Sequence, residues 1–206
     1  MSNTRLYLIT PDKFDLTEFS VQLEQALEGG DMASVQLRMK DSYDEDIIKA
    51  AKILMPICHA SDVAFIINDS AEIAKKVGAD GVHIGQEDMS YKEAREMLGD
   101  NQIIGVTCHD SKHLAMSAGE QGADYVAFGA FYPTATKLTM TVATTELLNW
   151  WQDLFEIPCV AIGGITVDNA ASLSEAGADF LAICSGVWDY PQGPKAAVKE
   201  LNQLIK

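Results

Sequence analysis

Three stretches of the chain carry almost the same phrase, Gly-Ala-Asp followed by apolar and small residues. The sequence reads GADGVHIG from residue 78, GADYVAFG from residue 122 and GADFLAIC from residue 177. In each copy the glycine suits the left-handed position that ends a helix, and the apolar run suits a buried strand. A weaker fourth copy, Gly30-Asp31, precedes the apolar segment 34–37. The repeat predicts the same helix-to-strand connection at four places.

The spacing of the copies predicts how many strands the chain has. The glycines at 30, 78, 122 and 177 lie 48, 44 and 55 positions apart. This is about twice the length of one strand-helix unit, so each interval has room for one more strand. Apolar segments at 6–9, 64–67, 103–106 and 159–162 supply these strands. Together with 34–37, 82–84, 125–128 and 180–183 they make eight.

Helical periodicity separates the predicted strands. Apolar residues recur at helical spacing, as in Ile47, Ile48, Ala51 and Leu54, or in Leu147, Leu148, Trp151 and Leu154. Alternating strands and helices predict a parallel sheet of the α/β class, and eight such units match a single-domain (β/α)8 TIM barrel over residues 1–206. A doubly wound open sheet is the alternative, but the eightfold count favours closure.

This fold separates stability from chemistry. The repeated Gly-Ala-Asp lies where helices lead into strands, at the face of the barrel that mainly serves stability. We expect the chemistry at the opposite face, where the strands end and the copies diverge.

Composition excludes several classes of protein. The formal net charge of -15 argues against a nucleic-acid partner, because phosphate backbones are held by clustered Lys and Arg. The first residues lack a basic segment followed by an apolar run, and no stretch suits a membrane span, so we expect a cytoplasmic protein without a membrane partner. The four cysteines are widely scattered, which predicts free buried thiols.

Charged residues follow several predicted strands. Asp69 and Asp88 end neighbouring strands, so their carboxylates can converge on one Mg²⁺ ion. Capping of the next helices is the alternative role. Arg38 and Lys40, two positions apart, are expected to face the same side, where an anion would balance them. A salt bridge from this pair to Asp69 is the alternative.

Glycines follow the last two predicted strands. Gly163-Gly164 and Ser185-Gly186 occupy the place where barrels commonly bind phosphate through backbone N–H groups and a helix N-terminus. Tight turns alone would also explain these glycines. Among the histidines, His83 is expected to be a hydrogen-bonded core residue, whereas His109, at a strand end, is the one placed to reach a substrate.

Seven segments, in order along nearly the whole chain, resemble the signature segments of the thiamine phosphate synthase family. They are VQLRMKD, IINDS, GADGVHIGQED, GVTCHD, FYPTATK, AIGGI and ICSG. The resemblance implies a transferase that joins hydroxymethylpyrimidine diphosphate to thiazole phosphate and releases diphosphate.

The resemblance also implies a role for individual residues. Arg38, Lys40 and Asn68 would hold the pyrimidine substrate's diphosphate, with Gln36 on the same side, and Asp69 and Asp88 would hold Mg²⁺. Thr107 stands where the family usually has a serine near the reacting pyrimidine, and Lys137 would contact the leaving diphosphate. The thiazole phosphate would be received by Thr134, Thr136, Gly164 and Ser185. Lys137, Thr107 and Arg38 are the predicted catalytic residues.

Other functions stay open at this point. The segment 132–145 is expected to close over the site as a flap. A thiazole tautomerase of the same fold is the nearest alternative, although it would need few of the diphosphate-binding residues. A non-catalytic protein that binds thiamine phosphates and a barrel enzyme acting on a sugar phosphate are the others. A homo-oligomer is compatible with all of them.

Overall fold

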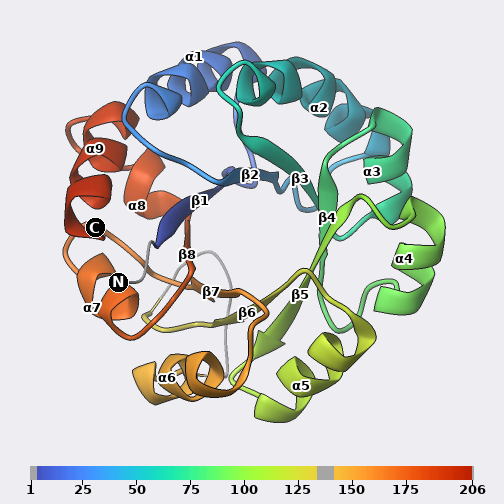
Figure 1. Ribbon diagram of the computed structural model, residues 1–206. Coiled ribbons are helices and arrows are strands. Elements are labelled where there is room, and N and C mark those ends of the chain that lie inside the picture. Colours follow the sequence, from blue (N-terminus) through green and yellow to red (C-terminus); the bar gives the residue numbers. More distant parts are fainter. Residues whose placement is uncertain (1–3, 134–141, 206) are drawn as a thin grey trace.

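The computed structural model describes residues 4–133 and 142–205. Its eight strands form one closed parallel barrel in sequence order, because β1 pairs with β8 as well as with β2 (Figure 1). The strands are β1 (Arg5–Ile9), β2 (Ser34–Leu37), β3 (Ala64–Asn68), β4 (Gly81–Ile84), β5 (Ile103–His109), β6 (Tyr125–Gly129), β7 (Cys159–Ile162) and β8 (Phe180–Ile183). All eight predicted strands and the (β/α)8 fold are confirmed, and the open sheet is excluded.

Helices surround the barrel (Figure 1). They are α1 (Leu16–Leu27), α2 (Asp44–His59), α3 (Ala71–Val77), α4 (Tyr91–Leu98), α5 (Lys112–Gln121), α6 (Thr145–Leu154), α7 (Ala170–Glu175), α8 (Ser185–Trp188) and α9 (Pro194–Leu204). The predicted apolar faces of α2 and α6 pack inward, except that Leu154, at the end of α6, is 62% exposed. No helix in the described ranges is both long and apolar enough to cross a membrane.

Two apolar clusters form the core. The larger one fills the space between the strands and the helices. The smaller one fills the barrel itself and includes Tyr7, Ile9, Tyr125 and Val160. Gly105 makes room for the Tyr125 ring, since a Cβ at that glycine would lie 1.8 Å from the ring carbon Cζ. The interior is therefore a packed core with two phenols in it, and the remaining open space lies above it.

The repeated aspartate ties strands together in pairs. The Asp80 carboxylate accepts a hydrogen bond from the N–H of Phe65 in β3 at 2.6 Å. Asp124 accepts from Ile104 in β5 at 2.7 Å, and Asp179 accepts from Cys159 in β7 at 2.8 Å. Each aspartate precedes an even-numbered strand and bonds the start of the odd-numbered strand before it. We call these three contacts the aspartate latches.

Each latch is completed by a side chain from the helix that leads toward the odd-numbered strand. His59 of α2 lies 2.8 Å from Asp80, Arg95 of α4 donates to Asp124 at 2.6 Å, and Gln152 of α6 donates to Asp179 at 2.7 Å. The glycines of the three full copies have the expected left-handed backbone, with φ 72° at Gly78, 96° at Gly122 and 94° at Gly177. Gly30 of the weaker copy differs, with φ 157°, and the residue that caps the end of α1, Glu28, has a right-handed conformation. The repeat is thus a structural device at the amino ends of the strands, as its position predicted.

We expect Asp124→Ala to lower the free energy of unfolding by about 1–3 kcal/mol, because Ile104 N–H and the Arg95 guanidinium would lose their shared acceptor. Turnover should stay near the parent value, since this latch lies at the opposite end of the barrel from the strand carboxyl ends. Chemical denaturation checks the first claim. Glu120→Ala, an exposed change on α5, is the matched control. Equal stability of the two variants would contradict a role for the latch.

Candidate active site

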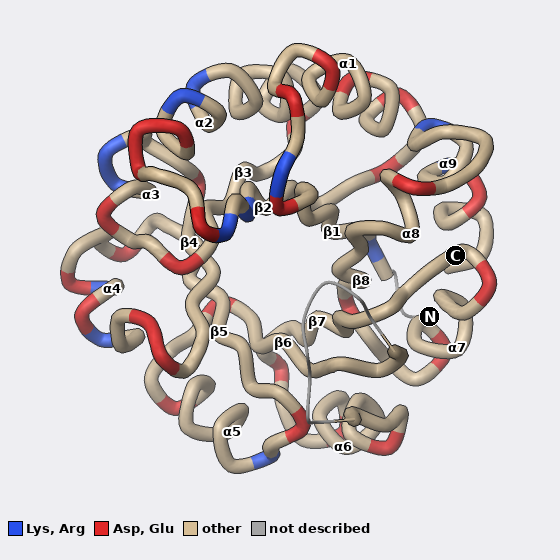
Figure 2. Tube along the Cα trace, turned by 180° about the vertical axis from the view of Figure 1, so that it is seen from behind, with Lys and Arg blue, Asp and Glu red and all other residues tan. Residues whose placement is uncertain are grey.

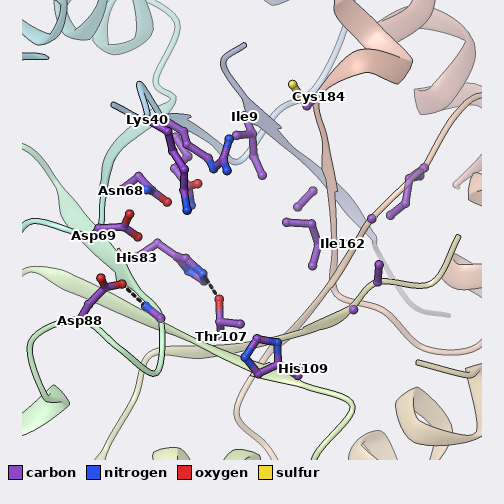
Figure 3. Close-up of a pocket in the computed structure, with 18 of the residues that line it drawn as sticks. Ile9, Lys40, Asn68, Asp69, His83, Asp88, Thr107, His109, Ile162 and Cys184 are labelled. Atoms are coloured by element: carbon purple, nitrogen blue, oxygen red, sulfur yellow. Dashed lines mark hydrogen bonds between the residues drawn. The ribbon is translucent and has the colours of Figure 1, made fainter. Parts of the chain in front are cut away.

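One cavity of about 420 Å³ opens at the carboxyl ends of the strands. Its lining contains every predicted site residue that the structure describes: Gln36, Arg38, Lys40, Asn68, Asp69, Asp88, Thr107, Gly164 and Ser185. The other three, Thr134, Thr136 and Lys137, lie outside the described residues, as does most of the predicted flap. Figure 3 shows Lys40, Asn68, Asp69 and Asp88 gathered on one side of the cavity, with Ile162 and Cys184 across from them.

The two carboxylates on this side influence one another. Burial first, and then the neighbouring charge of Asp88, raises the pKa of Asp69 to about 6, while Lys40 and Arg38 act in the opposite direction. The Asp69 backbone is left-handed, with φ 65°, which is uncommon for a residue other than glycine. One Asp88 oxygen accepts from Gly85 N–H at 2.7 Å. The backbone thus holds two like charges together beside the cavity.

Neither aspartate caps a helix, so that alternative is wrong. Ser70 caps α3 by accepting from Ile73 N–H, and Ser90 caps α4 in a reciprocal capping box with Glu93. The carboxylates of Asp69 and Asp88 are left to the cavity.

This pair fits a hard divalent cation. Mg²⁺ typically takes one or two protein carboxylates and completes its shell with water and substrate phosphate oxygens. A cation between the two carboxylates would also remove the repulsion that raises the pKa of Asp69. Among the described residues no group of three or more His, Cys, Asp or Glu side chains is placed to hold a metal.

The basic residues come from the segment directly after β2. The strand ends at Leu37, so Arg38 and Lys40 lie beyond it, yet both line the cavity. Arg38 forms an ion pair with Asp12 and not with Asp69, which corrects the alternative given above. Thr10 fixes the Arg38 backbone, since its hydroxyl accepts from Arg38 N–H at 2.9 Å. Figure 2 shows acidic positions all around the ring and basic positions beside β2 near its centre.

Across the barrel, the turn after β7 requires glycine. Gly163 and Gly164 have φ 107° and 63°, a region that side chains disfavour. A Cβ at Gly163 would lie 2.4 Å from Ala130 Cβ, and one at Gly164 would lie 2.5 Å from the Pro133 carbonyl oxygen. Asn169 holds the turn by donating to the Gly164 carbonyl at 3.0 Å and accepting from Thr166 N–H at 2.8 Å. The backbone of Gly163 and Gly164 therefore lines the cavity without a side chain of its own to cover it.

The end of β8 lines the cavity on the same side as the glycine turn after β7. Ser185 begins α8 and lines the cavity together with Cys184. Cys184 is only partly buried, unlike the other three cysteines, which corrects the expectation that all four are buried. Burial still raises the pKa of Cys184 to about 11, so this side chain is a neutral thiol.

His83 plays a larger part than the sequence indicated. It is hydrogen-bonded, as expected, with Nδ1 2.9 Å from the Tyr125 hydroxyl and Nε2 2.7 Å from Thr107 Oγ1, and it also lines the cavity (Figure 3). His109, at the end of β5 with φ 53°, lines it too. The position of His83 in the last half of a strand was the available signal, because such residues lie near the carboxyl face.

Comparison with known proteins identifies the family. The family model described as "Thiamine monophosphate synthase" matches residues 6–187. The thiamine-phosphate synthase of Rhodospirillum centenum is 58% identical over the full length of both chains, and that of Hyphomonas neptunium is 52% identical over 98% of this chain and 94% of that one. The solved thiamine phosphate pyrophosphorylase of Pyrococcus furiosus superposes with a TM-score of 0.86 at 32% identity, covering 99% of this chain and 96% of that one. The chain is a member of the thiamine monophosphate synthase family of enzymes.

Proposed function

We propose that this enzyme joins hydroxymethylpyrimidine diphosphate to thiazole phosphate, giving thiamine phosphate and diphosphate. The observation that carries the proposal is the arrangement of the cavity. Cations and carboxylates at the ends of β2, β3 and β4 face the glycine turns of β7 and β8 in one closed ring. A single cavity thus offers two anion-binding sides, as a reaction between two phosphorylated substrates requires.

Arg38, Lys40 and Asn68 bind the diphosphate in this proposal, with Gln36 beside them. Asp69 and Asp88 would hold Mg²⁺, which would supply positive charge to the departing diphosphate oxygens. Across the cavity, backbone N–H groups of the Gly164 turn and Ser185 receive the phosphate of the thiazole. Thr134, Thr136 and Lys137 keep the roles implied by the resemblance.

The reaction exchanges one bond for another. The bond between the pyrimidine methylene carbon and the diphosphate oxygen breaks, and its electron pair leaves with diphosphate. The thiazole nitrogen then forms the new carbon–nitrogen bond with its own lone pair. No proton needs to be removed from that nitrogen, so positioning and charge stabilisation suffice. This agrees with a cavity built from cations, carboxylates and glycine turns.

Arg38 is held in place before any substrate binds. Its side chain is 11% exposed and paired with Asp12, so its guanidinium is already oriented at the cavity wall. Because a preorganised donor loses less freedom on binding, Asp12 supports diphosphate recognition through Arg38. No sequence pattern indicated this pair, whose members lie 26 positions apart.

We place the reaction in the cytoplasm, since charged phosphorylated substrates do not cross membranes unaided.

A product assay tests the proposal. Purified protein, both substrates and Mg²⁺ should give thiamine phosphate, followed by the fluorescence of its oxidised form, together with stoichiometric diphosphate. EDTA should stop the reaction, and added Mg²⁺ should restore it. Isomerisation of a thiazole substrate without coupling would favour the tautomerase. Substrate binding without any product would favour the non-catalytic binder, and full activity in EDTA would refute the metal.

A further inference from the structure

A chain of polar side chains crosses the inside of the barrel and ends at the cavity. Gln36 Nε2 donates to the Tyr7 hydroxyl at 2.8 Å, and that hydroxyl lies 2.9 Å from the Tyr125 hydroxyl. The Tyr125 hydroxyl lies 2.9 Å from His83 Nδ1, and His83 Nε2 lies 2.7 Å from Thr107 Oγ1. Five side chains from five different strands are linked in this way. We call them the interior chain.

The interior chain is shut off from water except at its ends. Gln36 and Tyr7 are each 3% exposed, Tyr125 is 6% exposed and His83 is 8% exposed. Burial raises the pKa of both phenols above the usual value, so each keeps its proton. Each of the two phenol protons must therefore find an acceptor among the side chains of the interior chain, because a buried unpartnered hydroxyl is costly.

The protons available in the interior chain determine which group donates and which accepts in each of its hydrogen bonds. The Gln36 amide nitrogen can only donate, so Tyr7 accepts from it. In the described part of the protein, the oxygen of Tyr125 is then the acceptor left for the Tyr7 proton. Tyr125 in turn donates to His83 Nδ1, which must be unprotonated. A neutral imidazole that accepts at Nδ1 carries its proton on Nε2.

The geometry keeps the Tyr125 hydroxyl in this place. Its ring meets Tyr7 edge to face, with centroids 5.9 Å apart and an interplanar angle of 78°. Its other side stacks on His83 at 5.6 Å and 15°. The missing side chain of Gly105 provides the space for the ring. Tyr125 therefore has little freedom to turn its hydroxyl away from His83.

The consequence appears at the cavity. With its proton on Nε2, His83 donates to Thr107 Oγ1. We propose that Gln36, Tyr7 and Tyr125 hold His83 as the neutral Nε2–H tautomer and thereby direct the Thr107 hydroxyl proton into the cavity, where it selects a ligand atom with a lone pair. On the proposed function, which this step extends, that atom is an unprotonated ring nitrogen of the pyrimidine. Tyr7, Tyr125 and His83 are positioning residues.

The opposite arrangements leave a buried proton without an acceptor. If His83 carried its proton on Nδ1, or on both nitrogens, Tyr125 would accept from it and donate to Tyr7. Tyr7 would then accept two hydrogen bonds, one from Gln36 and one from Tyr125. Its own proton would have no acceptor among the described partners of that hydroxyl. The Gln36 amide thus sets the tautomer of His83 through two intervening side chains, Tyr7 and Tyr125.

Nitrogen NMR of the imidazole tests the assignment without any substrate. With ¹⁵N-labelled protein at neutral pH, the His83 ring should show a protonated Nε2 and an unprotonated Nδ1. A His83→Gln variant identifies the His83 signals against those of His59, His109 and His113. A protonated Nδ1, alone or together with Nε2, would overturn the proposal. Because this readout needs no turnover, it stands apart from the outcome of the product assay.

Two variants test the source of the tautomer. Gln36→Glu, studied at a pH at which the new side chain is ionised, replaces the donor with an acceptor of nearly the same shape, so Tyr7 should donate to the carboxylate and every later bond should reverse. The proton should move to Nδ1 of His83. Tyr7→Phe is the matched control, since it removes a buried hydroxyl but leaves Tyr125 able to donate only to Nδ1, and the Nε2–H form should persist. Persistence of Nε2–H in Gln36→Glu, or its loss in Tyr7→Phe, would overturn the mechanism.

Kinetics separate positioning from simple packing. Tyr125→Phe frees the tautomer of His83 and should lower kcat/KM for the pyrimidine substrate by roughly tenfold, the effect expected from one misdirected hydrogen bond. Tyr7→Phe removes an equally buried hydroxyl and should cost less. In Thr107→Ser, which keeps the hydroxyl, activity should be retained to a much greater extent than in Thr107→Val. Equal losses in the two tyrosine variants, with KM unchanged, would indicate packing alone and contradict the proposal.

Discussion

Asp69→Asn should lower kcat by on the order of 10²–10³-fold, because it removes a charge proposed to hold Mg²⁺ against the departing diphosphate. The amide has nearly the same shape, so the cavity keeps its form. Steady-state assays at saturating substrates and Mg²⁺ measure the loss. Asp110→Asn, an exposed carboxylate after β5 that does not line the cavity, is the control and should leave kcat unchanged. Retention of activity within about twofold in Asp69→Asn would refute the metal assignment.

The same variant should not lose stability in EDTA. The pKa of Asp69 is raised to about 6 in the folded protein, first by burial and then by Asp88. A raised pKa means that the folded state binds the proton more tightly than the unfolded state does, so the contribution of this group to stability is lost as the pH rises through about 6. At neutral pH the ionised carboxylate therefore opposes folding, and the uncharged amide of the variant relieves this. Denaturation curves showing a less stable variant would contradict that account.

Gly163→Ala should lower the free energy of unfolding by about 3 kcal/mol or more, because the new methyl group would combine backbone strain with overlap in a packed turn. Its Cβ would lie 2.4 Å from Ala130 Cβ and 2.6 Å from Ala130 Cα, and the backbone φ is 107°. The turn must move to relieve the overlap, so KM for the thiazole phosphate should rise as well. Thermal unfolding and kinetics measure the two effects.

Gly78→Ala separates strain from overlap. Gly78 also has a left-handed backbone, with φ 72°, but a Cβ there would have no neighbour within 4 Å. The expected loss is about 1–2 kcal/mol from the backbone alone. Kinetic constants should not change, because Gly78 lies at the amino ends of the strands. If both alanine variants lost the same stability, the overlap at Gly163 would have no energetic weight.

The fold was predictable because its signal is local and repeated. Eight short apolar segments alternate with segments of helical periodicity, and this alternation predicted a barrel before any contact was known. The helix caps were also readable, since Ser90 and Glu93 have the spacing of a capping box. Assigning that role to Asp88 as an alternative overlooked a better candidate two residues further along.

The site was predictable only in part, because ring closure decides its pairings. Cavity-lining residues could be expected from their positions at strand ends. The partners of those residues could not be predicted. Arg38 pairs with Asp12, which lies 26 positions away in the segment after β1, and His83 of β4 meets Tyr125 of β6, 42 positions away, inside the barrel. Periodicity indicates which face of a strand a residue occupies, but not which residue of another strand it meets.

The aspartate latches divide six of the eight strands into three pairs. Each latch joins β3 to the turn before β4, β5 to the turn before β6, or β7 to the turn before β8, and none joins β4 to β5 or β6 to β7. A chain opened at residues 99–102 separates Arg95 from Asp124 but keeps each aspartate on the same continuous segment as the strand N–H from which it accepts. One opened at residues 78–80 separates Asp80 from Phe65. New termini for a circular permutant, or the junctions of a chimaera with a related barrel, therefore belong between the latched pairs, where two-strand modules can be exchanged whole.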